Sequence, residues 1–132
     1  MKLINREILE AKAAIDELLQ AKMPVKVSWG LAKIGGKLNG IVLCIDPVRQ
    51  GLFNTYQIYT EPAEDGRINV KTRVETEPEE AIAKFMDELN ALMAQEVDLD
   101  VEKVAIPMEV DGKALEIKGA SLMALEKLIT VE

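Results

Sequence analysis

One apolar stretch, residues 24–52, constrains the fold more than any other part of the chain: PVKVSWGLAKIGGKLNGIVLCIDPVRQGL. Its large apolar residues alternate steps of four and three, the spacing of one stripe on an α-helix. They are Val27, Leu31, Ile34, Leu38, Ile41, Ile45, Val48 and Leu52. A second apolar row, about half a turn away, consists of Trp29, Ala32, Gly36, Gly40 and Leu43. A helix that is apolar on two sides is normally covered on two sides, so we expect a central helix whose second row lies mostly under the chain's own sheet.

The composition of this stretch also supports a rival interpretation, because it contains several glycines and Pro47. Glycine costs about 1 kcal/mol relative to alanine inside a helix, and an internal proline removes a donor and clashes with the preceding turn. Val25, Val27, Ile41 and Val42 would equally suit strands. The regular phase of the apolar stripe favours the helix, with a kink or break expected near Asp46 and Pro47. The glycines would let another backbone approach closely.

The flanking sequence predicts the other elements. Residues 6–21 have the same helical spacing, and the short link to Pro24 predicts an antiparallel helical hairpin over residues 1–52. Residues 56–74 alternate with period two around the turn EPAEDGR, which indicates a β-hairpin. Thr76 with Glu79 resembles a capping box for a helix that runs to about Gln95.

A second hairpin and a last helix complete the predicted order. Asp111-Gly112 is a strong two-residue turn signal; it pairs Val110 with Lys113, Met108 with Leu115 and Ile106 with Ile117. Ser121 is the predicted cap of the final helix. The fold class is therefore α+β, in the order α-α-β-β-α-β-β-α, with helices packed on a four-stranded antiparallel sheet. We expect one domain, 1–132, made of the helical hairpin (1–52) and two ββα units (53–132).

Composition and charge exclude several functional classes. The chain has 132 residues and a net charge of −7, which disfavours binding to a nucleic-acid backbone. It has no apolar run long enough for a membrane span and no apolar signal segment at its start, so we expect no membrane contact. Its one cysteine, Cys44, predicts a cytosolic origin by default.

The residues that usually carry catalysis are scarce. There is no histidine, which removes Ser-His and Cys-His pairs and most zinc sites. Gly35-Gly36-Lys37 lacks the first glycine and the final Ser or Thr of a phosphate loop. Cys44 lies between apolar neighbours, which predicts a small core residue. We therefore predict no catalytic residue, no metal site and no cofactor.

Two sets of residues are candidates for binding. The first is an interaction surface on the central helix: Trp29, Lys33, Gly36 and Gly40. Trp is enriched in protein-binding hot spots, although it more often belongs to a core. The second is an acidic face formed by alternate residues, Glu96, Asp98, Asp100 and Glu102. That face is first of all typical of a solvated sheet edge protected by charge. The functional alternatives are a cation site or a surface that mimics nucleic acid.

The stretch KMPVKVSWGLAKIGGKL resembles a segment of small proteins encoded by phages and prophages of Gram-positive bacteria. FMDELNALMAQEVDLDVEKVAI and the closing SLMALEKLI are similar to the same family. The chain departs from the family in its glycines, which stand where charged residues or Asn are usual. The resemblance implies a phage or prophage product that works in the bacterial host cytoplasm or in a virion, and it implies no reaction.

These observations support three hypotheses. The first is a non-enzymatic phage or prophage protein acting through protein–protein contacts, as a virion component, assembly factor or accessory protein, with a protein partner or self-association. The alternative is an acidic inhibitor of a host nucleic-acid-binding or defence enzyme. An enzyme or small-molecule binder with a carboxylate site is the third and least supported.

Overall fold

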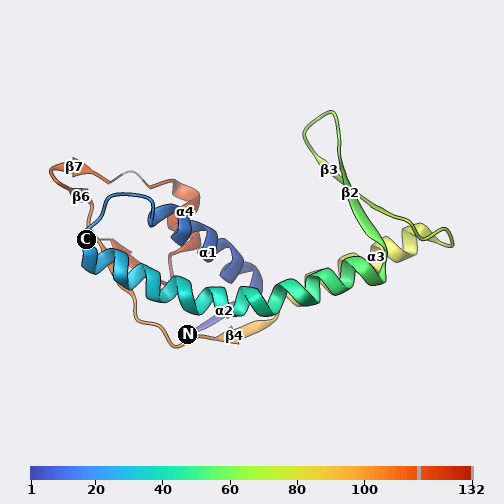
Figure 1. Ribbon diagram of the computed structural model, residues 1–132, viewed down its shortest axis with the longest axis horizontal. Coiled ribbons are helices and arrows are strands. Elements are labelled where there is room, and N and C mark those ends of the chain that lie inside the picture. The colour runs from blue at the N-terminus through green and yellow to red at the C-terminus, as the bar shows by residue number, and fades with distance from the viewer. Residues whose placement is uncertain (116, 132) are drawn as a thin grey trace. The chain divides into compact units, whose positions relative to one another are not determined.

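The computed structural model describes residues 1–115 and 117–131 and divides into two compact units (Figure 1). One unit, here the terminal unit, combines Met1–Val42 with Glu96–Glu132. The other, the middle unit, is Leu43–Gln95. The long helix α2 (Val25–Thr55) contributes its first part to the terminal unit and its second part to the middle unit.

The terminal unit is built on two helices that share one core. The carboxylate of Glu7 accepts the backbone N–H of Ile4 at 3.0 Å, so α1 (Asn5–Leu18) begins directly after strand β1 (Lys2–Ile4). Figure 1 shows α1 and the first part of α2 running in opposite directions, as the predicted helical hairpin requires. The side chains that fill this core from the two helices are Ile8, Ala11, Ala14, Ile15, Leu18, Leu31, Ile34 and Leu38.

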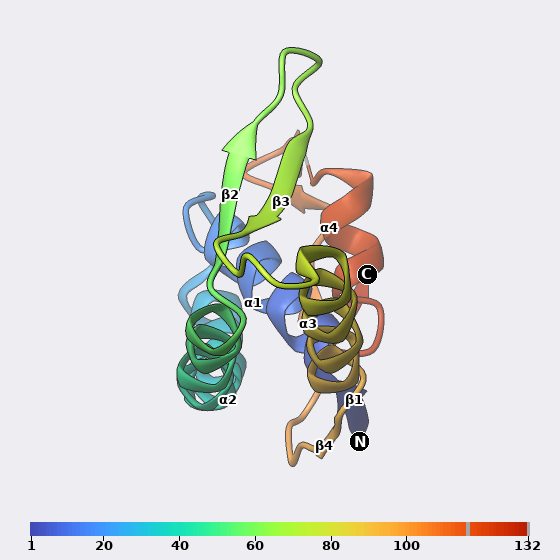
Figure 2. The same ribbon diagram turned by 90° about the vertical axis from the view of Figure 1, so that its right-hand side faces the viewer.

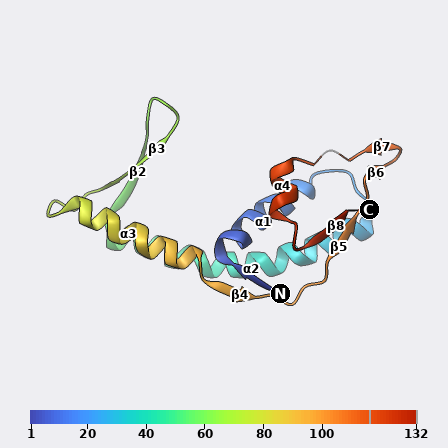
Figure 3. The ribbon, with the colours of Figure 1, turned by 180° about the vertical axis from the view of Figure 1, so that it is seen from behind.

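Short strands complete the terminal unit. β1 pairs antiparallel with β4 (Glu96–Asp98), and β6 (Glu109–Val110) pairs antiparallel with β7 (Lys113–Ala114). β5 (Val104–Ile106) and β8 (Ile129–Val131) lie side by side and parallel (Figure 3). The short helix α4 (Gly119–Ala124) lies between β7 and β8 along the chain. The first strand, β1, and the last described strand, β8, are thus each paired with a strand from the interior of the chain.

The middle unit is a hairpin and a helix against the second part of α2. Strands β2 (Ile58–Pro62) and β3 (Ile68–Thr72) form the antiparallel hairpin that the sequence predicts. Helix α3 (Pro78–Met93) lies beside α2, and the hairpin projects away from both (Figure 2). Phe85 is buried, with the ring centroids of Phe53 and Tyr56 at 5.0 and 6.4 Å from its own.

The mixed α+β class is confirmed, but the single four-stranded sheet is wrong. The described strands form separate two-stranded sheets. The turn at Asp111-Gly112 is as predicted, since Val110 lies opposite Lys113 and Leu115 donates to the carbonyl of Met108 at 2.7 Å. The third pair is wrong, because Ile106 pairs with Val131 near the end of the chain and not with Ile117.

Three further local predictions are corrected. α2 runs through Gly35, Gly36 and Pro47 to Thr55. Of the kink or break expected near Asp46 and Pro47, the break therefore does not occur, and the kink stays a prediction. α3 begins at Pro78 after Glu77, and its start has no side-chain cap, so Thr76 is not the cap. Ser121 lies within α4 and donates to Glu17 at 3.2 Å instead of capping the helix.

Candidate interaction surface

The two sides of α2 have opposite environments. Leu31 and Leu38 on the predicted stripe are fully buried. Trp29, half a turn away, is 63% exposed, and Val25 is 85% exposed. The prediction that the chain's own sheet covers this side is therefore wrong, because the strands pair elsewhere. We call the exposed row in the terminal unit the Trp29 face; it consists of Val25, Trp29, Ala32, Gly36 and Gly40.

The glycines of α2 fall into two groups. A Cβ added at Gly30 would lie 2.9 Å from Cγ2 of Val104, and one added at Gly35 would lie 3.2 Å from Cγ2 of Ile15. These two glycines allow the close approach of neighbouring elements that the sequence suggested. A Cβ at Gly36 or Gly40 would meet no atom within 4 Å. At Gly36 and Gly40, the Trp29 face therefore exposes helix backbone that no other element of the described chain covers.

Lysines line one flank of the Trp29 face. Lys26, Lys33 and Lys37 are spaced by seven and four residues, which places them on the same side of the helix. The Nζ of Lys33 lies 5.9 Å from the centroid of the Trp29 ring, within reach of a cation–π contact. The Nζ of Lys37 donates to the backbone carbonyl of Asp100. In residues 1–115 and 117–131, none of the three is in an ion pair with a carboxylate.

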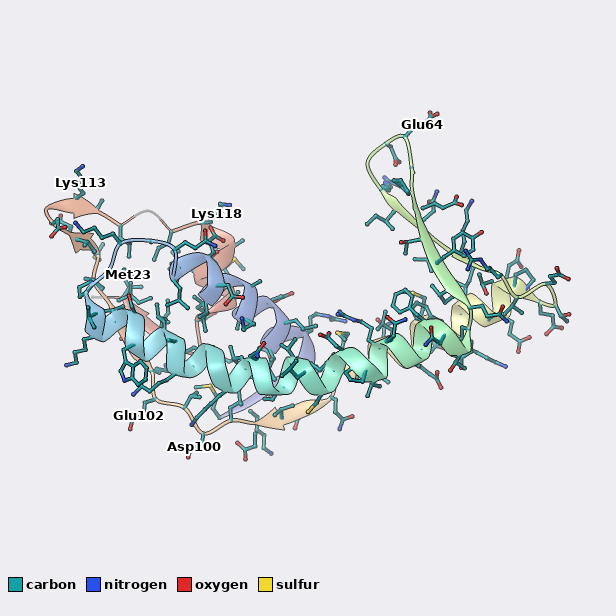
Figure 4. The ribbon with its side chains drawn as sticks, viewed as in Figure 1. Met23, Glu64, Asp100, Glu102, Lys113 and Lys118 are labelled. Atoms are coloured by element: carbon teal, nitrogen blue, oxygen red, sulfur yellow. The ribbon has the colours of Figure 1, made fainter. Side chains whose placement is uncertain are left out.

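The contact of Lys37 places the acidic residues beside this flank. Glu96, Asp98, Asp100 and Glu102 are all exposed, while Leu99 between them is buried, as the alternation predicts. Regular strand covers only Glu96 to Asp98. Asp98 accepts from the N-terminal ammonium of Met1 at 3.3 Å. Figure 4 shows Asp100 and Glu102 on the segment that runs along α2, with their carboxylates pointing outward.

The predicted surface includes Trp29, Lys33 and the two open glycines but leaves out Val25, Lys26 and Lys37. From the sequence alone, Val25 suits a strand, and Lys37 belongs to an incomplete phosphate-loop pattern. The signal for Lys37 was available, because it follows Lys33 by four residues and so shares its side of the helix. Its hydrogen bond to Asp100 is a long-range contact that no local pattern predicts.

The remaining candidates for chemistry are weak. Cys44 is exposed, so its prediction as a core residue is wrong. A depression of about 80 Å³ lies between α1 and α4, far below the usual size of a small-molecule site. A larger open depression of about 500 Å³ follows α2 alone, and its two charged side chains, Asp46 and Arg49, pair with each other at 2.8 Å. The described ranges contain no group of three or more potential metal ligands.

No protein family, curated protein or solved structure matches this chain. Among the helices of residues 1–115 and 117–131, none is long and apolar enough to cross a membrane. The surface that stands out is the Trp29 face with its lysine flank and the acidic segment beside it.

Proposed function

We propose that this chain is a non-enzymatic phage or prophage protein that binds another protein through the Trp29 face. The observation that carries the proposal is the 63% exposure of Trp29 on a helix whose opposite side fills the core. Tryptophan dominates many protein-binding hot spots, and exposed apolar patches mark interaction surfaces. The sequence resemblance supports a virion component, assembly factor or accessory protein in the bacterial cytoplasm or the virion.

The test compares proteins recovered with the tagged full-length chain from bacteria in which a prophage is induced. We expect Trp29→Glu to lose the partners that the parent chain retains. Met123→Glu is the matched control, because Met123 is 79% exposed on α4, outside the Trp29 face. Circular dichroism must show that both variants are folded. Recovery of the same partners with Trp29→Glu would contradict the proposal.

The second candidate function is inhibition of a host nucleic-acid-binding or defence enzyme by the acidic segment. The exposure of Glu96, Asp98, Asp100 and Glu102 on one segment favours it. Binding of this kind weakens steeply with salt. If a recovered partner binds equally well at low and high salt, the acidic segment does not act as a decoy for nucleic acid.

A further inference from the structure

We infer that the protein bound by the Trp29 face is a second copy of this chain, with the two α2 helices packed antiparallel. This inference rests on the proposed function, and it identifies the protein that the Trp29 face binds. A two-fold axis between residues 34 and 35 would relate the two helices. Such an interface is isologous, so one surface must complement itself.

The shape of the Trp29 face meets this requirement. Trp29 protrudes at one end, and Gly40 leaves the backbone bare at the other, eleven residues away along the helix. At a rise of 1.5 Å per residue, this separation is about 16 Å. Rotation about the proposed axis places Trp29 of each copy over Gly40 of the other. Ala32 and Gly36 lie between these two contacts, and small residues there allow an interaxial distance of about 8 Å.

In the same register, Lys33 of one copy meets one carboxylate of the other copy, that of Asp100, although Lys37 adds a like charge nearby. The axis brings Lys33 of one copy level with Gly36 of the other, next to Lys37. Because the Nζ of Lys37 donates to the backbone carbonyl of Asp100, Asp100 lies beside Lys37 in each copy. Lys33 of one copy would therefore approach the Asp100 carboxylate of the other. Neither side chain has an ion-pair partner among the described residues. The outward direction of Asp100 in Figure 4 leaves its carboxylate open to this contact.

A second copy also accounts for the cost of the open glycines. Gly36 and Gly40 each lower helix stability relative to alanine, and no atom of the described chain lies within 4 Å of the position that a Cβ would take at either residue. A foreign partner would have to supply both a protrusion and a gap at the right spacing. This chain already contains both, eleven residues apart on one face.

The first test is the molecular mass of the full-length protein by sedimentation equilibrium over a wide concentration series. We expect the parent chain to approach twice the mass of one copy. Trp29→Ala should raise the dissociation constant about 30-fold or more, the usual effect of removing a hot spot. Met123→Ala should leave it unchanged. A parent chain that stays monomeric at every concentration, or a dimer indifferent to Trp29→Ala, overturns the inference.

The second test is a charge exchange that probes the antiparallel register. Lys33→Glu and Asp100→Lys should each weaken the dimer several-fold, because each replaces an attraction with a repulsion. The double variant restores opposite charges and should recover most of the parent affinity. If the double variant associates no better than the single ones, the register is wrong and the inference fails.

Failure of the inference can be told apart from failure of the proposed function. A monomeric chain that still recovers a different protein in a Trp29-dependent way overturns the second copy and leaves the proposed function standing. A monomeric chain whose partners do not depend on Trp29 overturns both.

Discussion

At the scale of residues, the same amino acid has different consequences at neighbouring positions of α2. The sequence shows five glycines in the helix, but it cannot show which of them face another element. Gly30 and Gly35 face side chains of Val104 and Ile15, whereas Gly36 and Gly40 face open space. The partners of Gly30 and Gly35 are distant along the chain, so only the folded structure separates the two groups.

This difference predicts opposite effects of two matched substitutions. Gly36→Ala should raise the free energy of unfolding of the monomer by about 1 kcal/mol, because it gains helix propensity without a clash. Gly30→Ala gains the same propensity but overpacks against Val104, at a typical cost of 1–3 kcal/mol, so its net effect should be destabilising. Urea unfolding at a concentration that keeps the chain monomeric measures both. A more stable Gly30→Ala would contradict the packing described for Val104.

The carboxylate of Glu7 makes the stability of the folded chain depend on pH. Its pKa lies below the ordinary value of 4.5, first because it accepts the backbone N–H of Ile4 and second because of Lys127 at 2.9 Å. The unfolded chain therefore binds the proton more readily. The ionised Glu7 carboxylate therefore stabilises the fold at a pH above its ordinary pKa of 4.5. This stabilisation is lost as the pH falls through the lowered pKa of the folded chain.

We therefore expect Glu7→Gln to be less stable than the parent chain at neutral pH, with a difference that shrinks under acid conditions. Glu10→Gln on the exposed side of α1 is the control for charge. Thermal unfolding between pH 7 and pH 3 measures both variants. A difference between the Glu7→Gln and parent melting temperatures that does not change with pH would rule out this linkage.

At the scale of elements, local patterns predicted most helices and hairpins but fewer of their ends. The four–three spacing predicted which side of α2 is buried between Leu31 and Ile45, because that spacing follows from helix geometry. Val48, on the same predicted stripe, is 52% exposed. The caps were harder, because several residues near each start can supply a hydrogen bond. Thr76 fits the capping pattern, yet Glu77 precedes α3 in a left-handed conformation, with φ of 49°.

The start of α3 gives an element-scale prediction. Glycine enters the left-handed region without the penalty of about 1–2 kcal/mol that other residues incur. Glu77→Gly should therefore raise the free energy of unfolding by up to about 1 kcal/mol, after allowance for its greater unfolded entropy. Thr76→Ala should change it by less than about 0.5 kcal/mol, as for an ordinary surface substitution. A loss near 1 kcal/mol for Thr76→Ala would restore Thr76 as the cap.

At the scale of the whole molecule, the sequence predicted the α+β class but not the strand partners. β1 and β8 lie at the two ends of the chain and pair with β4 and β5, far away in sequence. Period-two alternation identifies a strand without identifying the strand that pairs with it. A strand of three residues is also too short to show a clear alternation. The single domain over residues 1–132 stays a prediction.

The candidate surface shows the same limit. Helical spacing, which is a local pattern, predicts that Trp29, Lys33, Gly36 and Gly40 share one side of the helix. What covers them depends on the assembly of distant strands, and the expected sheet does not form. Because the described strands pair only in twos, they form no larger sheet that covers α2, and the Trp29 face stays exposed.

The central claim is that this chain leaves the Trp29 face open for a partner, and fluorescence tests it directly because Trp29 is the only tryptophan. In dilute solution, where the chain is monomeric, we predict a red-shifted emission that acrylamide quenches readily. As the concentration rises and the second copy binds, the emission should shift to the blue and quenching should fall. Emission that is blue-shifted and protected in the folded monomer would show that the chain covers Trp29 itself, and would contradict the account.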